Sequence, residues 1–238
     1  MIPLRKISGL RLFYKILYLF FPKRCALCHA PLQEESEGLC LSCAARLPYT
    51  GFAGRQGTRM ERMLWGKIPL GRVSAYCYYI KDSPFASLVH QLKYYGRKDL
   101  GVIMGRHLSA ELMQTDFFTD MDVIVPVPLH WKKEKARGYN QSYCLALGVS
   151  QITGIPIDST SLQRKSYTQT QTHQSVDGRW QNVADVFVLT APEKFAGKHI
   201  LLMDDVFTTG ATVTACADAF SSVPDIHISV LTLACTDY

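Results

Sequence analysis

The stretch "LLMDDVFTTGATV", from Leu201 to Val213, decides the fold class. Its apolar start is typical of a buried strand, and the Thr and Gly residues predict a turn before a helix that begins near Thr212. Gly210 permits a tight turn and a close approach of the backbone to a ligand. Amide N–H groups, threonine hydroxyls and the partial positive charge of a helix N-terminus attract phosphate oxygens. The stretch therefore predicts a phosphate site after a strand.

Two adjacent acids, Asp204 and Asp205, stand in front of this anion site, and we expect both in a solvent-facing loop. No lysine follows the turn, which excludes a nucleotide P-loop and favours a monophosphate. Carboxylates beside a phosphate can accept hydrogen bonds from sugar hydroxyls, so a ribose 5-phosphate accounts for both features. The alternative is that the two acids end the strand by chance and do not bind a sugar, for example as part of a Mg²⁺-binding phosphoacceptor site. The expected phosphate contacts come from Thr208, Thr209, Gly210, Ala211 and Thr212.

Strand-like and helical segments alternate along the rest of the chain, which predicts an open, mostly parallel α/β sheet flanked by helices. Ligands in such sheets bind beyond the carboxyl ends of the strands. Residues 46–70 have no clear periodicity, and residues 158–182 are polar and predict a loop. The expected strands are 72–80, 122–128, 183–189, 198–204 and 225–235, and the expected helices are 83–95, 100–113, 140–154 and 212–222.

Composition limits the class of protein. The chain has 238 residues, of which 47% are hydrophobic and 19% charged, enough for one core with a small appended module. A net charge of +6 suits phosphorylated ligands or nucleic acid. The N-terminal "LRLFYKILYLFFP" is too short for a transmembrane segment, and Lys15 interrupts it. We expect an amphipathic helix over residues 1–22 in a cytoplasmic protein, with membrane-surface contact as the alternative.

Four of the eight cysteines have the spacing of metal ligands in "CALCHAPLQEESEGLCLSC", residues 25–43. Two C-x2-C turns, Cys25 with Cys28 and Cys40 with Cys43, can complete a tetrahedron of thiolates around a structural Zn²⁺. Two redox pairs or an iron–sulfur ligand set are the alternatives. The other cysteines sit singly in apolar stretches and are expected in the core.

The stretch 201–213 resembles the phosphoribosyltransferase signature, in which two acids precede T-T-G/S-x-T. Together with "VPVPLHWKKEKARGYNQS" (125–142), "LKYYGRK" (92–98), the Thr, Gln, Arg and Asn residues of 168–182 and the four-cysteine module, nearly the whole chain resembles the ComF/GntX family. These are competence-associated, phosphoribosyltransferase-like proteins. One departure is Gln174, where family members often carry Leu.

The resemblance implies a zinc-ribbon module at 23–48 and a type I phosphoribosyltransferase-like domain at 49–238, with a hood and first helices at 49–120 and the core sheet at 121–238. It implies phosphoribosyl pyrophosphate as donor, with Mg²⁺. Asp204 and Asp205 would be catalytic, stabilising an oxocarbenium-like transition state on the ribose, and a loop around 166–179 would close over the site. The candidates for the pyrophosphate and its loops are Val127, Pro128, Arg137, Thr168, Gln171 and Arg179.

No pattern for recognising an acceptor base is evident, so two classes of function remain open. One is a phosphoribosyltransferase with an unidentified acceptor, in DNA uptake. The other is a non-catalytic module that binds phosphoribosyl pyrophosphate or single-stranded DNA, alone or as a homodimer, with competence or recombination proteins. Tyr94 and Tyr95 beside basic residues suit base stacking. Lys93 and Arg97 are weaker candidates for binding the pyrophosphate, and a solvated face is their alternative role. For Arg137 the alternative is an exposed helix start, and Asn140 and Gln141 can serve simply as helix caps.

Overall fold

The computed structural model describes residues 22–33, 36–165 and 186–236. The chain divides into two compact units, Met1–Leu47 and Pro48–Tyr238. The predicted amphipathic helix lies outside the described residues except for Pro22. In the described part of the first unit, an antiparallel bridge joins Arg24 to Pro31, and the short helix α2 covers Leu41–Ala44. None of the helices in the described ranges is both long and apolar enough to cross a membrane.

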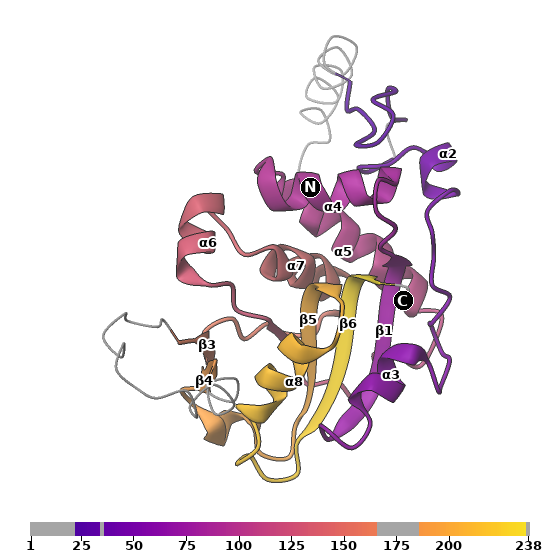
Figure 1. Cartoon of the computed structure of the whole chain (residues 1–238). Helices are drawn as coiled ribbons and strands as arrows, with labels where there is room; N and C mark the ends of the chain where they lie inside the picture. The colour runs from indigo at the N-terminus through magenta and orange to yellow at the C-terminus, as the bar shows by residue number, and fades with distance from the viewer. Residues whose placement is uncertain (1–21, 34–35, 166–185, 237–238) are drawn as a thin grey trace, which may run out of the picture. The chain divides into compact units, whose positions relative to one another are not determined.

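The second unit is built on a parallel sheet with the strand order β1-β6-β5-β2 (Figure 1). Every neighbouring pair in this sheet runs parallel. The central strands are apolar and buried on both faces, as a parallel sheet covered by helices requires. The strands are β1 (Leu70–Tyr78), β2 (Val123–Pro126), β5 (His199–Phe207) and β6 (His227–Cys235). The predicted mostly parallel sheet flanked by helices is confirmed.

Helices cover the two faces of this sheet (Figure 1). Against one face pack α3 (Arg59–Leu64) and α8 (Ala211–Asp218), whose buried side chains join the core cluster of Val73, Val125, Leu202 and Val230. The other face is covered by α5 (Lys98–Leu112) and α7 (Gln141–Thr153), while α4 (Pro84–Tyr94) packs against α5. Connections through helices on both faces are what parallel strands require.

Helices α5 and α7 approach each other closely because glycines form their interface. A Cβ atom at Gly148 would collide with the carbonyl oxygen of Val102, and one at Gly105 would collide with that of Leu145. These collisions involve backbone, which cannot turn away as a flexible side chain can. The two predicted helices thus pack backbone to backbone, which fixes α7 against the sheet.

The structure differs from the predicted elements in several places. Strand β5 continues to Phe207 instead of ending at Asp204, because Phe207 pairs with Cys235 of β6. The predicted loop at 158–182 begins with strand β3 (Leu162–Arg164), which pairs antiparallel with β4 (Phe187–Leu189). The helices α3 and α6 (Trp131–Arg137) and the 3₁₀ turn at Pro192–Phe195 were not expected. The sheet also takes β1 from the range 49–120.

Candidate functional site

The loop after β5 turns sharply at Gly210, directly before α8. Gly210 caps α8 with a positive φ of 77°, and it is packed so tightly that a Cβ there would lie 3.0 Å from Cζ of Phe207 and 3.3 Å from Cδ2 of Leu64. Glycine is therefore required for both conformation and space. The residues around the N-terminus of α8 are exposed at Thr208, Thr209, Ala211 and Thr212, and the Ala211 amide donates to Oγ1 of Thr209 at 3.4 Å.

The two acids precede this loop within the strand. An Oδ1 atom of Asp204 accepts hydrogen bonds from the Ser142 hydroxyl at 3.0 Å and from the Asp205 amide at 2.8 Å. Asp205 forms an ion pair with Lys93, with 3.1 Å between Oδ2 and Nζ, and its side chain is only 15% exposed. The expectation that both acids lie in a solvent-facing loop is wrong, because the extended strand draws them between α4 and α7.

This setting changes the proton affinity of Asp204. Burial raises its pKa to about 7, and the adjacent charge of Asp205 raises it in the same direction. The Asp205 amide, the Ser142 hydroxyl and the Lys93 ammonium oppose that shift because they stabilise the charged form. Asp204 is therefore harder to ionise in the folded protein than in the unfolded chain.

Lys93 lies at the acids, although the sequence indicated it only as a weaker candidate for binding pyrophosphate and favoured a solvated face. The predicted solvated face is wrong for it, because its ammonium contacts Asp205 and its side chain is 25% exposed. The neighbouring Arg97 is different, since its guanidinium pairs with Asp99 at 2.8 Å. Arg97 is thus engaged locally, and Lys93 is the basic residue at the acids.

The segment after β2 lies beside the acids. The amide of Val127 donates to the carbonyl of Met203 at 2.9 Å, one residue before Asp204. Asn140 holds this segment from the other side, since its Nδ2 donates to the Val127 carbonyl at 2.9 Å while its Oδ1 caps α7 at the Ser142 amide. The predicted cap is confirmed, and it also positions the loop that starts at Val127 and the half-buried Pro128.

Two buried side-chain polar atoms in the described residues have no hydrogen-bond partner. One belongs to Gln141, next to Asn140 in the sequence, and the other to Thr236, which lines a cavity together with Thr208. Gln141, at the start of α7, leaves its Nε2 unpaired although the residue is 2% exposed. Thr236 leaves its Oγ1 unpaired, and it lines a small cavity of about 30 Å³ next to Thr208. Orphaned buried donors of this kind call for an explanation, such as a ligand or a water molecule.

The remaining pyrophosphate candidates are not brought to the acids by any described contact. Arg137, at the end of α6, stacks on the ring of Tyr94 with 5.2 Å between Cζ and the ring centroid. This places its charge over Tyr94, the last residue of α4. Three candidates lie outside the described residues, namely Thr168, Gln171 and Arg179.

The first unit brings all four predicted metal ligands together. The sulfurs of Cys25, Cys28, Cys40 and Cys43 lie within 4.8 Å of one another. The Sγ atoms of Cys28 and Cys40 are 3.7 Å apart. Four sulfurs at about 2.3 Å from a zinc in a tetrahedron are separated by about 3.8 Å. The donor set and its spacing therefore fit a structural Zn²⁺.

The thiols of this cluster titrate differently. Burial raises the pKa of Cys25, but the backbone N–H groups of Cys28, Cys40 and Leu27 lower it by more, to about 6. For Cys43, burial and the neighbouring thiols raise the pKa. The cluster thus stabilises one thiolate readily and resists further negative charge, which a divalent cation would relieve.

The fold and the cysteine cluster define an α/β protein with a parallel sheet and an N-terminal four-cysteine zinc-ribbon module. Residues 16–55 match the family model of a double zinc ribbon domain. The chain is 33% identical over 207 residues to the DNA utilization protein YhgH of Salmonella typhi, across 82% of this chain and 89% of the relative. Competence protein F of Haemophilus influenzae is 27% identical over 210 residues, with the same coverage. The chain belongs to the family of these two proteins.

A solved structure of glutamine phosphoribosylpyrophosphate amidotransferase from B. subtilis is similar to 60% of this chain and 30% of its own, with 22% identity and a TM-score of 0.39.

Proposed function

We propose that this protein binds phosphoribosyl pyrophosphate with Mg²⁺ and transfers its ribose 5-phosphate to an unidentified nitrogenous acceptor during DNA uptake, in the cytoplasm. One observation carries the proposal. Two acids that face α4 and α7 are followed at once by an open Thr–Gly loop at a helix N-terminus, at the carboxyl end of a central parallel strand. Phosphate and vicinal hydroxyls on one ligand match these two features.

The donor would lie along β5 and its loop. Its 5-phosphate would accept hydrogen bonds from the backbone of Gly210 and the helix start, and from the hydroxyls of Thr208 and Thr209. Its ribose hydroxyls would donate to Asp204 and Asp205. Its pyrophosphate would extend toward the segment at Val127, which Asn140 holds in place.

In the reaction, the bond between the anomeric carbon and pyrophosphate breaks, and a nitrogen of the acceptor forms the new bond. Positive charge develops on the ribose, and the carboxylates of Asp204 and Asp205 stabilise it. Lys93 holds the carboxylate of Asp205 in place before the donor arrives. Asp204 and Asp205 are the hard oxygen ligands that could hold Mg²⁺ together with donor oxygens, and the ion would offset the charge of the pyrophosphate.

The test is a screen of nitrogenous acceptors for pyrophosphate release with Mg²⁺ present. One acceptor should release pyrophosphate with the native protein, and Asp205→Asn should lower that rate by at least about tenfold because it removes a charge facing a cationic transition state. Asp99→Asn is the matched control, since Asp99 pairs with Arg97 away from the acids, and it should leave the rate unchanged. Equal rates in all three proteins would contradict the proposal.

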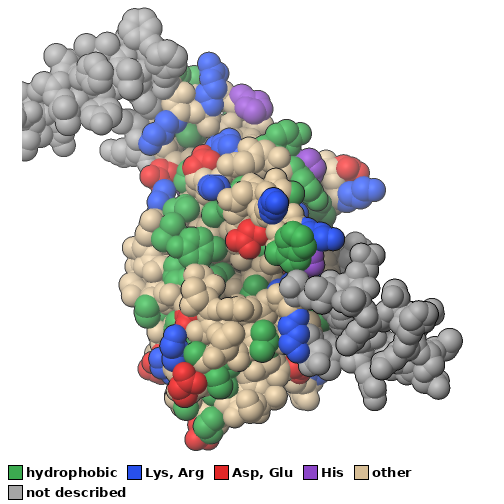
Figure 2. All heavy atoms as spheres, turned by 90° about the vertical axis from the view of Figure 1, so that its left-hand side faces the viewer, with side chains coloured by type: hydrophobic (Ala, Val, Ile, Leu, Met, Phe, Trp, Pro, Cys, Tyr) green, Lys and Arg blue, Asp and Glu red, His purple; other side chains and the backbone are tan. Residues whose placement is uncertain are grey.

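A second candidate is binding of single-stranded DNA without catalysis, favoured by the surface of α6. This helix has no buried residue and carries Lys132, Lys133 and Lys135 beside Trp131, which is 51% exposed. Tyr94 adds a ring that is 63% exposed. Figure 2 shows the side of the molecule where α6 lies, with Lys and Arg side chains among hydrophobic ones. Exposed rings among cations are typical of stacking platforms for bases.

Titration with oligo-dT at two salt concentrations tests this candidate. Binding through α6 should weaken steeply with salt, and Trp131→Ala should weaken it at both concentrations. Ile152→Ala is the control, because it removes an exposed apolar side chain from α7 instead. Salt-independent binding, or equal loss in the two variants, would exclude the α6 platform.

A further inference from the structure

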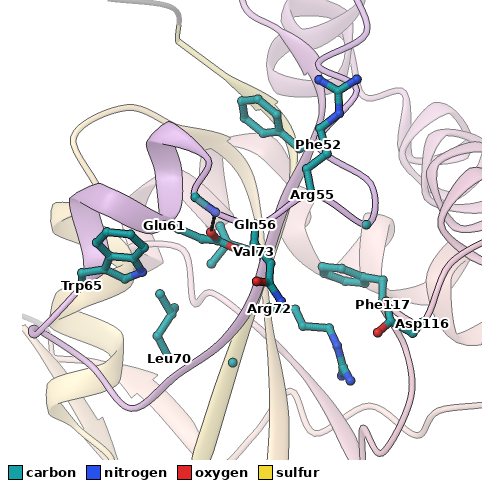
Figure 3. Close-up of a pocket in the computed structure, with 13 residues that line it drawn as sticks. Phe52, Arg55, Gln56, Glu61, Trp65, Leu70, Arg72, Val73, Asp116 and Phe117 are labelled. Carbon is teal, nitrogen blue, oxygen red and sulfur yellow. Dashed lines mark hydrogen bonds between the residues drawn. The ribbon is translucent and has the colours of Figure 1, made fainter.

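We infer that a cavity at the amino end of β1 is a second ligand site, which takes a nucleobase with its phosphate at the rim, that is, a nucleotide. The cavity has a volume of about 320 Å³ and lies between the segment 52–57, α3, the start of β1 and residues 116–117 (Figure 3). This volume falls in the range of small-molecule sites. The inference goes beyond the proposed function and does not depend on it.

The cavity is distinct from the strand-end site. It shares none of the residues that line the acids or the phosphate loop. Along the sheet, Leu70 of the cavity is level with Ile228 of β6, which pairs with Ile200 at the start of β5. Asp204 pairs with Thr232, farther along β6. Because the strands are parallel, the cavity and the phosphate loop lie toward opposite ends of the sheet.

The walls of the cavity suit a flat ring. Trp65 and Leu70 stand on one side and Phe117 on the other, with Val73 between them (Figure 3). Phe117 is only 3% exposed and so is fixed in place, whereas Trp65 is 59% exposed and can cover a bound ring. Aromatic and aliphatic walls in this arrangement bury both faces of a heterocycle.

Polar groups inside the cavity select a ring that carries N–H donors. Glu61 is 8% exposed, and its Oε2 caps α3 by accepting from the amides of Gly57 and Thr58. Its Oε1 accepts no hydrogen bond from a residue of the described ranges. An amino or ring N–H group of a base could donate a hydrogen bond to this second carboxylate oxygen. The amide of Gln56 lies beside Glu61 in Figure 3 and can read a second position of the ring edge.

The rim supplies a cation for the phosphate. Arg72 donates from Nη1 to the carbonyl of Thr119 at 2.8 Å, which anchors its guanidinium at the cavity and leaves its other N–H groups for a ligand. Guanidinium forks bind phosphate oxygens in pairs. An apolar slot with an acceptor inside and an arginine outside thus matches the ring and the phosphate of one nucleotide.

The test is calorimetric titration with AMP, GMP, CMP and UMP, and with phenyl phosphate as the control ligand that has a ring and a phosphate but no N–H donor. Ribose 5-phosphate is present at saturation to occupy the strand-end site. At least one nucleotide should bind at least about tenfold more tightly than phenyl phosphate, because only the base can donate to Glu61. Binding of that nucleotide should also quench the fluorescence of Trp65.

Variants then locate the site. Glu61→Gln keeps the helix cap, since Gln serves in a capping box, and should remove the preference for the nucleotide over phenyl phosphate. Gln56→Ala, at an exposed residue, should weaken nucleotide binding without any change in the thermal midpoint. Arg72→Met should weaken both ligands by about tenfold. Arg62→Ala is the matched control, an exposed residue of the same helix that does not line the cavity, and should bind like the native protein.

Three results would overturn the inference: no nucleotide bound at millimolar concentration, phenyl phosphate bound as tightly as every nucleotide, or nucleotide binding lost in Asp205→Asn but kept in Glu61→Gln, Gln56→Ala and Arg72→Met. The last result would assign nucleotides to the strand-end site. Failure of the strand-end proposal leaves a different pattern, in which ribose 5-phosphate does not bind and the cavity variants still control nucleotide binding.

Discussion

Replacement of Asp204 by Asn should stabilise the protein at alkaline pH and leave it nearly unchanged in acid. In the folded state, burial and the charge of Asp205 raise the pKa of Asp204 to about 7 from an ordinary value of 3.8. The folded chain therefore holds a proton there more tightly than the unfolded chain does. The native protein loses stability as pH rises from about 4 to about 7, and the loss is complete above that. Asparagine has no charge to lose, and its carbonyl can still accept from Ser142.

The size of the effect follows from the shift. A pKa raised by about three units corresponds to a ceiling of about 4 kcal/mol, at about 1.4 kcal/mol per unit. Relaxation of the protein and water around the buried charge reduces this ceiling. We therefore expect Asp204→Asn to gain about 2 kcal/mol over the native protein at about pH 8, and less than half of that at about pH 5.

Urea denaturation followed by circular dichroism at these two pH values measures the difference, with zinc present throughout. Other titrating groups are common to both proteins and cancel in the comparison. A gain of equal size at both pH values, or a loss at about pH 8, would refute the reasoning about burial and charge. The same variant should bind the donor more weakly, so stability and function would change in opposite directions.

Two further predictions concern the scaffold. Cys40→Ser should lower the zinc content below one ion per chain and loosen residues 22–48, while the circular dichroism signal of the sheet domain is kept. If amide exchange shows that residues 22–48 stay ordered without metal, the zinc assignment is wrong. Gly148→Ala should lower the free energy of unfolding in urea by at least about 3 kcal/mol, because the new Cβ would meet the backbone of α5. Gly154→Ala is the control: the space around it is open but its φ is positive, so it should lower this free energy by only about 1 kcal/mol. Equal losses in the two variants would contradict the close contact.

Local patterns made much of this structure predictable. The apolar run before Asp204 and the Thr–Gly turn after it indicated the strand, the loop and the helix, because each of these is encoded by neighbouring residues. The paired C-x2-C turns indicated the metal cluster for the same reason. The amphipathic patterns of α4, α5 and α7 gave their bounds to within two residues.

Other features depend on contacts between distant segments. Lys93 of α4 pairs with Asp205 of β5, a contact between segments far apart in the sequence, which no local pattern around Lys93 could predict. The strand continues through Asp204 because β6 offers pairing partners there. Helix α6 escaped notice because it buries no residue and so has no apolar periodicity. The cavity beside Glu61 is assembled from separate segments, none of which carries a motif.

Calorimetric titration with phosphoribosyl pyrophosphate and Mg²⁺ tests the central claim most directly, with the native protein, Asp205→Asn and Thr209→Val compared. The account predicts that the native protein binds the donor. Asp205→Asn should bind it about tenfold more weakly, at a loss of about 1–2 kcal/mol, yet still bind ribose 5-phosphate through the loop. Thr209→Val should weaken both ligands, because it removes a phosphate donor. If Asp205→Asn instead binds the donor more tightly, the carboxylates merely repel an anion, and the assignment of the ribose to them is wrong.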